Sequence, residues 1–152
     1  MKKFLISIAL ILAPTMVHSL EAEYNRTIDG DTVVISLLDQ NIPAVFRDKI
    51  PVRLRGLDSP PLNNYKNCVK EADLGLMAKE YTKKLMESAN KVEIANVSRG
   101  KFFRVVADVI ITTDEGKNNV GDLLMIKGLA LKWDGKTKKP NWCMAPYPPS
   151  KT

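Results

Sequence analysis

The chain has 152 residues, a formal net charge of +6, two cysteines and a single histidine, His18. A chain of this length is expected to form one domain. His18 falls inside the leader segment described below, so the rest of the chain has no histidine. This excludes histidine nucleophiles, histidine general bases and most zinc sites. Hydrolytic chemistry in such a chain would have to use carboxylates, arginines and a hard cation bound by oxygen atoms.

Residues 1–19 have the pattern of a secretory signal peptide. Lys2 and Lys3 precede an apolar run at residues 4–13, and residues 17–19 offer small side chains for cleavage. The run is shorter than the roughly 18 apolar residues that a membrane span needs, and an uncleaved N-terminal anchor is the alternative. Cleavage would lower the net charge to about +4. The mature protein is then expected to be periplasmic or secreted, without stable membrane association.

Both cysteines, Cys68 and Cys143, lie in the mature part of the chain. In an oxidising compartment they have only each other as partners, which predicts a disulfide. Closing a loop of this length would stabilise the fold by roughly 4 kcal/mol in the chain-entropy model. A reactive thiol is the alternative, but neither cysteine has a histidine nearby in the sequence.

After the leader, the sequence predicts a turn, a strand and a loop. Asp-Gly-Asp at residues 29–31 is a strong turn signal, and residues 32–37 then alternate as a strand does. Residues 39–49 are polar and irregular, which indicates a loop.

A second alternating segment covers residues 50–57. Val52 and Leu54 alternate with Arg53 and Arg55, so the apolar and the basic side chains are expected on opposite faces. Two prolines follow this segment and cannot continue a hydrogen-bonded ladder, so the strand is expected to end before them.

The remaining sequence predicts a long helix, two strands, a short helix and an irregular tail. The expected ranges are 71–89 for the long helix, 91–97 and 102–112 for the strands, 114–117 for a turn, 120–127 for the short helix and 134–152 for the tail. This order fits a mainly β protein with helices, in which residues 20–133 form a five-stranded OB-fold barrel. The concave face of that barrel commonly binds oligonucleotides.

Three aspartates lie at the ends of the first two predicted strands. Asp29 and Asp31 flank the glycine turn, and Asp58 ends the second strand. If these strands are neighbours, the carboxylates of Asp31 and Asp58 can point into one pocket. Two carboxylates with a backbone carbonyl suit Ca²⁺, or Mg²⁺ with more water. The alternative is structural, since Asp-Gly-Asp is a common hairpin connection and an aspartate can cap a turn.

Arg53 and Arg104 lie on separate predicted strands between apolar residues. An arginine at the rim of a barrel can hold a phosphate through a bidentate pair of hydrogen bonds. At about 4 Å and an effective dielectric constant near 20, such a charge pair is worth about 4 kcal/mol. A solvated strand face is the alternative interpretation of both residues.

Four motifs within residues 25–133 occur in the order of one known family. They are Asp-Gly-Asp-Thr at 29–32, Val-Arg-Leu-Arg-Gly-Leu-Asp-Ser-Pro at 52–60, Lys-Phe-Phe-Arg-Val-Val-Ala-Asp-Val at 101–109 and Val-Gly-Asp-Leu-Leu-Met-Ile-Lys-Gly-Leu-Ala at 120–130. Together they resemble the staphylococcal nuclease (thermonuclease) family. Cys68, the Leu74-Gly75 pair and the late Trp142-Cys143 pair resemble its exported, plasmid- and phage-associated branch.

The resemblance implies a calcium-dependent endo- or exonuclease that hydrolyses DNA or RNA with a metal-activated water. Asp31, Asp58 and the backbone carbonyl of Ser59 would bind the Ca²⁺, with serine in place of the family's usual threonine. The partner implied is a nucleic acid, and a monomer is expected.

The resemblance also implies residues that contact the substrate. Arg53 would bind the phosphate being cleaved, and Arg104 would stabilise the charge that develops on it. Lys101 would contact a flanking phosphate, whereas Phe102 stands where the family has a tyrosine and offers a stacking surface. Trp133 could add stacking, and a place in the core is the alternative.

One departure from the family pattern concerns catalysis directly. The family has a glutamate after its Asp-Thr-Pro run, where it acts as or assists the general base, and this chain has Pro61 there. Assistance of this kind is typically worth about 10²–10⁴-fold in rate. Cleavage is therefore expected to be weak, and a catalytically impaired nucleic-acid-binding module is the alternative function.

Overall fold

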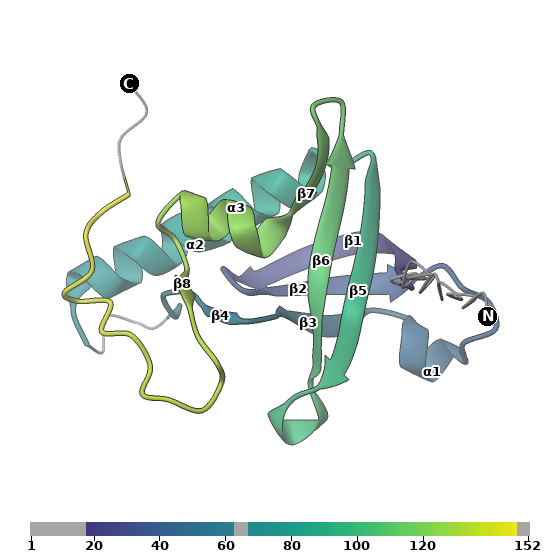
Figure 1. The fold of residues 1–152 in the computed structure, drawn as a ribbon, viewed down its shortest axis with the longest axis horizontal. Coiled ribbons are helices and arrows are strands. Elements are labelled where there is room, and N and C mark those ends of the chain that lie inside the picture. Colours follow the sequence, from purple (N-terminus) through teal and green to yellow (C-terminus); the bar gives the residue numbers. More distant parts are fainter. Residues whose placement is uncertain (1–17, 63–66, 149–152) are drawn as a thin grey trace, which may run out of the picture.

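The structure is a computed structural model that describes residues 18–62 and 67–148, so most of the predicted signal peptide lies outside the described residues. Five strands form a closed barrel: β1 (Leu20–Asp29), β2 (Thr32–Leu37), β3 (Ile50–Leu54), β5 (Lys91–Arg99) and β6 (Val105–Thr113). They follow the order β3-β2-β1-β5-β6, and a parallel pairing of β3 with β6 closes the barrel (Figure 1). The predicted five-stranded barrel is confirmed.

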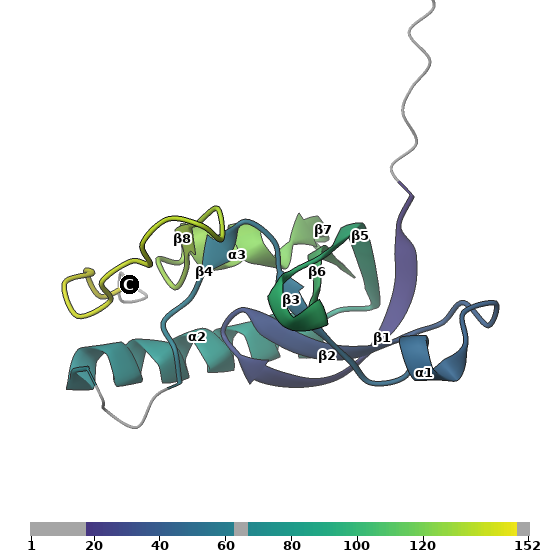
Figure 2. The same ribbon diagram turned by 90° about the horizontal axis from the view of Figure 1, so that it is seen from below.

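Helices and short strands surround this barrel. They are α1 (Ala44–Arg47), β4 (Leu57–Asp58), α2 (Val69–Glu87), the 3₁₀ turn η1 (Lys101–Phe103), β7 (Gly116–Asn119), α3 (Val120–Ile126) and β8 (Leu131–Lys132). The long helix α2 packs against β1 and α3, and α3 packs against β6. Figure 2 shows α2 and the C-terminal segment on the same side of the molecule, away from α1. None of the described helices is long and apolar enough to cross a membrane.

Alternating side chains on β3 and β6 help to fill the barrel. On β3, Val52 and Leu54 are buried and Arg53 is half-buried, and Arg55, just after the strand, is exposed, as the sequence predicts. On β6 the inward positions are occupied by Ala107, Val109 and Ile111, because side chains at every second position of a strand share one face. On β2 and β5, by contrast, four consecutive residues are buried.

Strand β1 is absent from the sequence-based prediction. It pairs with β2 and with β5, and its first half alternates, with Glu21 and Glu23 exposed on one face and Ala22 buried on the other. The alternation stops at Asn25 and Arg26, which are both exposed. Two register shifts, at Tyr24–Arg26 and at Thr27–Asp29, bend the strand so that it can pair with both neighbours. Only the first half of the strand therefore has a period of two.

Three further boundaries differ from the prediction. The loop predicted at 39–49 contains the single helical turn α1. The strand predicted at 50–57 divides into β3 and β4 because Gly56 takes a left-handed conformation, with φ of 73°. The turn predicted at 114–117 leads directly into β7, which adds a short strand beside β6.

The strand predicted at 102–112 begins three residues late, at Val105. Phe102 and Phe103 have positive φ values of 56° and 59°, which a strand cannot accommodate. They form the 3₁₀ turn η1 at the end of the β5–β6 hairpin, and Arg104 follows it outside the strand (Figure 1). The prediction that Phe102 and Arg104 lie on a strand is therefore wrong.

The predicted disulfide between Cys68 and Cys143 is confirmed, with a Cα–Cα distance of 6.0 Å. It joins the residue that precedes α2 to the C-terminal segment, which has no helix or strand between Lys132 and the end of the described chain. Trp142, beside the disulfide, is only 2% exposed and belongs to the hydrophobic core. The segment is irregular, as predicted, but it is anchored to the barrel.

Candidate functional site

Two buried carboxylates meet at one end of the barrel. Asp31 is the second residue of the β1–β2 turn and Asp58 ends β4, and the two are 3% and 1% exposed. The ladder between β2 and β3 places Thr32 opposite Arg53, and the amide of Leu54 donates to the carbonyl of Asp31 at 2.8 Å. Neighbouring strands therefore bring together residues that lie more than twenty positions apart in the sequence.

Gly30 makes this approach possible because a larger residue would not fit. A Cβ atom at this position would lie 2.6 Å from the Cβ of Ala78 and 2.8 Å from the Oγ of Ser59. The hydroxyl of Thr82 donates to the carbonyl of Gly30 at 2.7 Å. Helix α2 and the Ser59 loop are thus pressed against the turn, and the backbone amide of Ser59 donates to Asp31 Oδ2 at 3.0 Å.

Arg53 connects the two carboxylates. Its Nη1 donates to Asp31 Oδ1 at 2.5 Å, and its Nη2 donates to Asp58 Oδ1 at 3.2 Å and to the carbonyl of Leu57 at 3.4 Å. The guanidinium side chain is 16% exposed. Since a guanidinium has five N–H donors, these three bonds leave two for another acceptor.

Burial is the main influence on the ionisation of Asp31. It raises the pKa of this carboxyl to about 6, with a further upward contribution from the nearby Asp29. The charge of Arg53, the Ser59 amide and the Thr32 hydroxyl act in the opposite direction but do not outweigh burial. A carboxylate in such surroundings gains stability from an additional cation.

The donor chemistry of this end of the barrel fits a hard cation. Asp31 and Asp58 supply oxygen atoms, which Ca²⁺ and Mg²⁺ prefer, and Ser59 is hydrogen-bonded to Asp31. Within residues 18–62 and 67–148 no three His, Cys, Asp or Glu side chains gather into a metal-binding group. A cation here would consequently take its other ligands from the backbone, from water or from a bound phosphate.

Two residues of the C-terminal segment reach Asp58, and sequence reasoning missed both. Lys139 Nζ donates to Asp58 Oδ1 at 2.6 Å, and Trp142 Nε1 donates to Asp58 Oδ2 at 3.2 Å. The signal that could have indicated them is Cys143, because the disulfide to Cys68 fixes this segment near the residues that follow Asp58.

Trp133 forms a side of the same site. Its ring centre lies 5.9 Å from the guanidinium carbon of Arg53 and 5.2 Å from Lys139 Nζ, distances typical of cation–π contacts. Its amide donates to the carbonyl of Gly56, and its indole N–H donates to the carbonyl of Thr137. The half-buried ring is therefore at the site, not in the core.

The other predicted substrate contacts do not touch the carboxylates. Lys101, Phe102 and Arg104 are exposed on the turn η1 and just after it, and Phe102 is 91% exposed. Among the described residues, the Arg104 side chain has no contact with Asp31 or Asp58. The residue after Arg104, Val105, pairs with Val52 beside Arg53. The structure thus brings together Asp31, Asp58, Ser59, Arg53 and Trp133, and places Lys101 and Phe102 on the turn η1.

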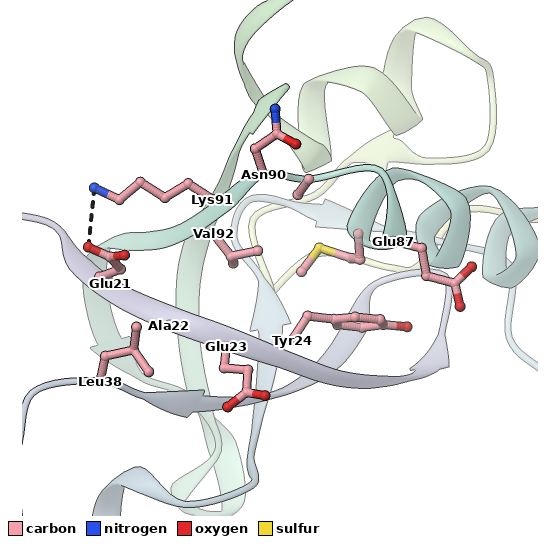
Figure 3. Close-up of a pocket in the computed structure, with 11 residues that line it drawn as sticks. Glu21, Ala22, Glu23, Tyr24, Leu38, Glu87, Asn90, Lys91 and Val92 are labelled. Carbon is pink, nitrogen blue, oxygen red and sulfur yellow. Dashed lines mark ion pairs between the residues drawn. The ribbon is translucent and has the colours of Figure 1, made fainter. Parts of the chain in front are cut away.

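A separate surface pocket of about 440 Å³ lies between the start of β1, the end of α2 and the start of β5 (Figure 3). Glu21, Glu23, Glu87 and Lys91 are its charged residues, and Lys91 pairs with Glu21 at 3.3 Å. Three carboxylates against one ammonium make this pocket unsuitable for a phosphate. The carboxylate pair around Arg53 remains the candidate site.

A comparison with protein families identifies the family of this chain, whereas no curated protein matches it. The family model described as staphylococcal nuclease homologue matches residues 51–144, a range that begins in β3 and includes Arg53, Asp58, Lys139 and Trp142. The chain belongs to the staphylococcal nuclease homologue family.

Proposed function

We propose that this protein is a calcium-dependent phosphodiesterase that hydrolyses DNA or RNA. The observation that carries the proposal is the pairing of buried Asp31 and Asp58 around Arg53. Membership of a nuclease-type family supports it. Two buried acids and one arginine with unused donors form a site that can accept both a cation and a phosphate.

Asp31, Asp58 and the carbonyl of Ser59 would hold the calcium ion. When bound, calcium would supply positive charge next to the phosphodiester and lower the pKa of a coordinated water. The burial that raises the pKa of Asp31 also favours a cation at that carboxylate. The oxygen-only donor set excludes the softer metals that prefer sulfur or imidazole.

Arg53 would bind the phosphate with its two remaining N–H donors while it keeps the carboxylates in place. Its double role makes it a poor target for a catalytic test. Removing it would take the charged partner from Asp31 and one of two charged partners from Asp58, at a cost of about 3–5 kcal/mol. Lost activity in such a variant would not distinguish catalysis from folding.

The exposed residues would act on the substrate at the edge of the site. Trp133 would stack on a base next to Arg53, since base–aromatic stacking tolerates any base. Lys101 and Phe102 would contact the strand beyond it. Arg104 would stabilise the developing charge after the bound substrate has drawn it in from solvent.

A second candidate function is a binding module of the same fold, and Pro61 is the observation that favours it. Proline cannot accept a proton, so this position offers no side-chain base. Nearby Glu71 is 5% exposed and accepts a hydrogen bond from the Asn67 side chain at 2.6 Å, which keeps it in the first turn of α2. Metal and phosphate binding would persist in such a module while hydrolysis is slow.

The variant Pro61→Glu tests the choice between these functions. The backbone here is fixed by α2, since a Cβ on Gly75 would lie 2.6 Å from the Pro61 carbonyl, while the Pro61 side chain is exposed. A glutamate therefore fits without disturbing the loop. Hydrolysis of single-stranded DNA with calcium is expected to rise at least 10²-fold, and the matched variant Leu62→Glu is expected to have no effect.

The assay compares cleavage and binding with calcium and with a chelator. Cleavage by the wild-type protein that stops on chelation supports the nuclease. Binding without cleavage by the wild type over a long incubation supports the binding module instead, and Pro61→Glu should then raise activity sharply. An unchanged rate in Pro61→Glu would contradict the placement of Pro61 at the general-base position. Parallel assays on RNA give the substrate preference.

Export is also proposed, with the mature protein periplasmic or secreted and monomeric. The leader at residues 1–19 and the Cys68–Cys143 disulfide support it. Sequencing of the exported protein should give Leu20, the first residue of β1, as the N-terminus. Retention of the leader in the exported protein would contradict cleavage.

A further inference from the structure

The carboxylate of Asp58 is engaged by three donors, two of which are positively charged. Oδ1 accepts from Lys139 at 2.6 Å and from Arg53 at 3.2 Å, and Oδ2 accepts from the indole of Trp142 at 3.2 Å. Asp58 is 1% exposed, so these contacts take the place of water. The donors come from the barrel on one side and from the C-terminal segment on the other.

This arrangement balances the charge of the site without a metal ion. The buried pair Asp31 and Asp58 carries two negative charges, which the two positive charges of Arg53 and Lys139 offset, and Asp29 adds a negative charge nearby. A divalent cation at the carboxylates would meet an ammonium on the oxygen atom that it needs. Like charges at contact distance repel strongly in a buried site, so both cannot share Asp58 Oδ1.

Arg53 and Lys139 differ in how easily they could leave. The side chain of Arg53 is 16% exposed and is held by Asp31, Asp58 and the Leu57 carbonyl. The side chain of Lys139 is 59% exposed, and within residues 18–62 and 67–148 its one hydrogen bond is to Asp58. Lys139 is thus the replaceable cation of the pair.

The surroundings of Lys139 keep it close to Asp58 even after displacement. Trp142 is buried beside the Cys68–Cys143 disulfide, and the Trp133 ring lies 5.2 Å from Lys139 Nζ. An ammonium that moves off Asp58 would still find the face of this ring, which attracts cations.

We propose that Lys139 is a tethered counter-ion that occupies the cation position at Asp58 and that calcium must displace. Lys139 then lowers the affinity of the site for calcium and sets the concentration at which the site fills. The inference rests on the proposed function, because it requires the divalent cation to bind at Asp31 and Asp58.

The test is the calcium affinity of Lys139→Gln, measured by calorimetry on the mature, disulfide-bonded protein. Glutamine keeps the length of the side chain approximately and removes the charge. Loss of one charged hydrogen bond to a buried carboxylate is expected to tighten calcium binding about tenfold. Lys138→Gln is the matched control, since Lys138 is a neighbouring exposed lysine with no contact to Asp58, and its affinity should equal that of the wild type.

Thermal unfolding gives a second readout that does not depend on activity. Calcium at a fixed concentration should raise the melting temperature of Lys139→Gln more than that of the wild type, because tighter binding stabilises the folded state further. Without calcium, Lys139→Gln should melt below the wild type, since Asp58 has lost a partner.

Three results would overturn the proposal. Equal calcium affinities in the wild type and Lys139→Gln would remove the role of Lys139 and leave the metal site in place. If Lys139→Gln binds calcium as tightly as the wild type but binds single-stranded DNA more weakly, Lys139 is a phosphate ligand. Failure of both proteins to bind calcium would overturn the metal site itself, and the role of Lys139 with it.

Discussion

Replacement of both cysteines by serine tests how much the fold depends on its covalent link. The disulfide joins residues 75 positions apart, and the chain-entropy model gives a loop of that length about 4.5 kcal/mol of stabilisation. Cys68 is also the N-cap of α2, where its sulfur accepts from the amide of Glu71 at 3.3 Å. Serine is a favoured N-cap residue, so Cys68→Ser should recover up to about 1 kcal/mol.

The free energy of unfolding should therefore fall by about 4 kcal/mol, which corresponds to a decrease in melting temperature of about 10–15 °C for a chain of this size. Urea unfolding followed by circular dichroism measures the loss directly. The variant Cys68→Ala/Cys143→Ser separates the cap from the disulfide and should be less stable than the serine pair by about 1 kcal/mol. A serine pair that melts within about 2 °C of the oxidised wild type would refute the reasoning.

Three further changes probe the site. Gly30→Ala should abolish calcium binding while the barrel remains folded, because the new Cβ would push Ser59 away from Asp31. If calorimetry shows that the variant keeps its calcium affinity, the packing around Gly30 is not as close as described. Arg104→Ala should remove cleavage and leave the melting temperature unchanged, since the side chain is exposed; a rate equal to that of the wild type would exclude the role. Burial raises the pKa of Asp31 to about 6 in the folded protein, above the 3.8 of an ordinary aspartate. Its proton is therefore held more tightly when the protein is folded, and the stability of the metal-free protein should fall as the pH rises from about 4 to 6. Asp31→Asn should remove that fall in urea titrations, and an identical pH profile would refute the assignment.

The barrel was predictable because most of its strands follow simple periods. The strands predicted from residues 32–37 and 50–54 are β2 and β3, although every residue of β2 except Ser36 is buried, and the closed sheet follows from the motif order. The whole of β1 was not predictable from its period, since the alternation of its first half stops at Asn25 and Arg26, which are both exposed, and two register shifts break its pairing. The start of β6 was missed because the local conformation of Phe102 and Phe103 overrides their high strand propensity.

The candidate site was predictable only where neighbouring strands supply it. Asp31, Arg53 and Asp58 follow from turn signals and strand ends, so their proximity could be expected before the structure. Lys139 and Trp142 could not, because no periodicity relates an irregular segment to a site more than eighty residues earlier. Only the disulfide indicates that the C-terminal segment lies near the site. It fixes the position of the segment without specifying which of its side chains point inward.

The hydrogen bond between Trp142 and Asp58 spans 84 positions of the chain. Contacts of such long range form late, after the loops between them have closed. A chain released before its final segment has docked would contain both acids and the arginine, yet Asp58 would lack two of its three donors. The site is therefore complete only when the polypeptide has folded from its first strand to its second cysteine.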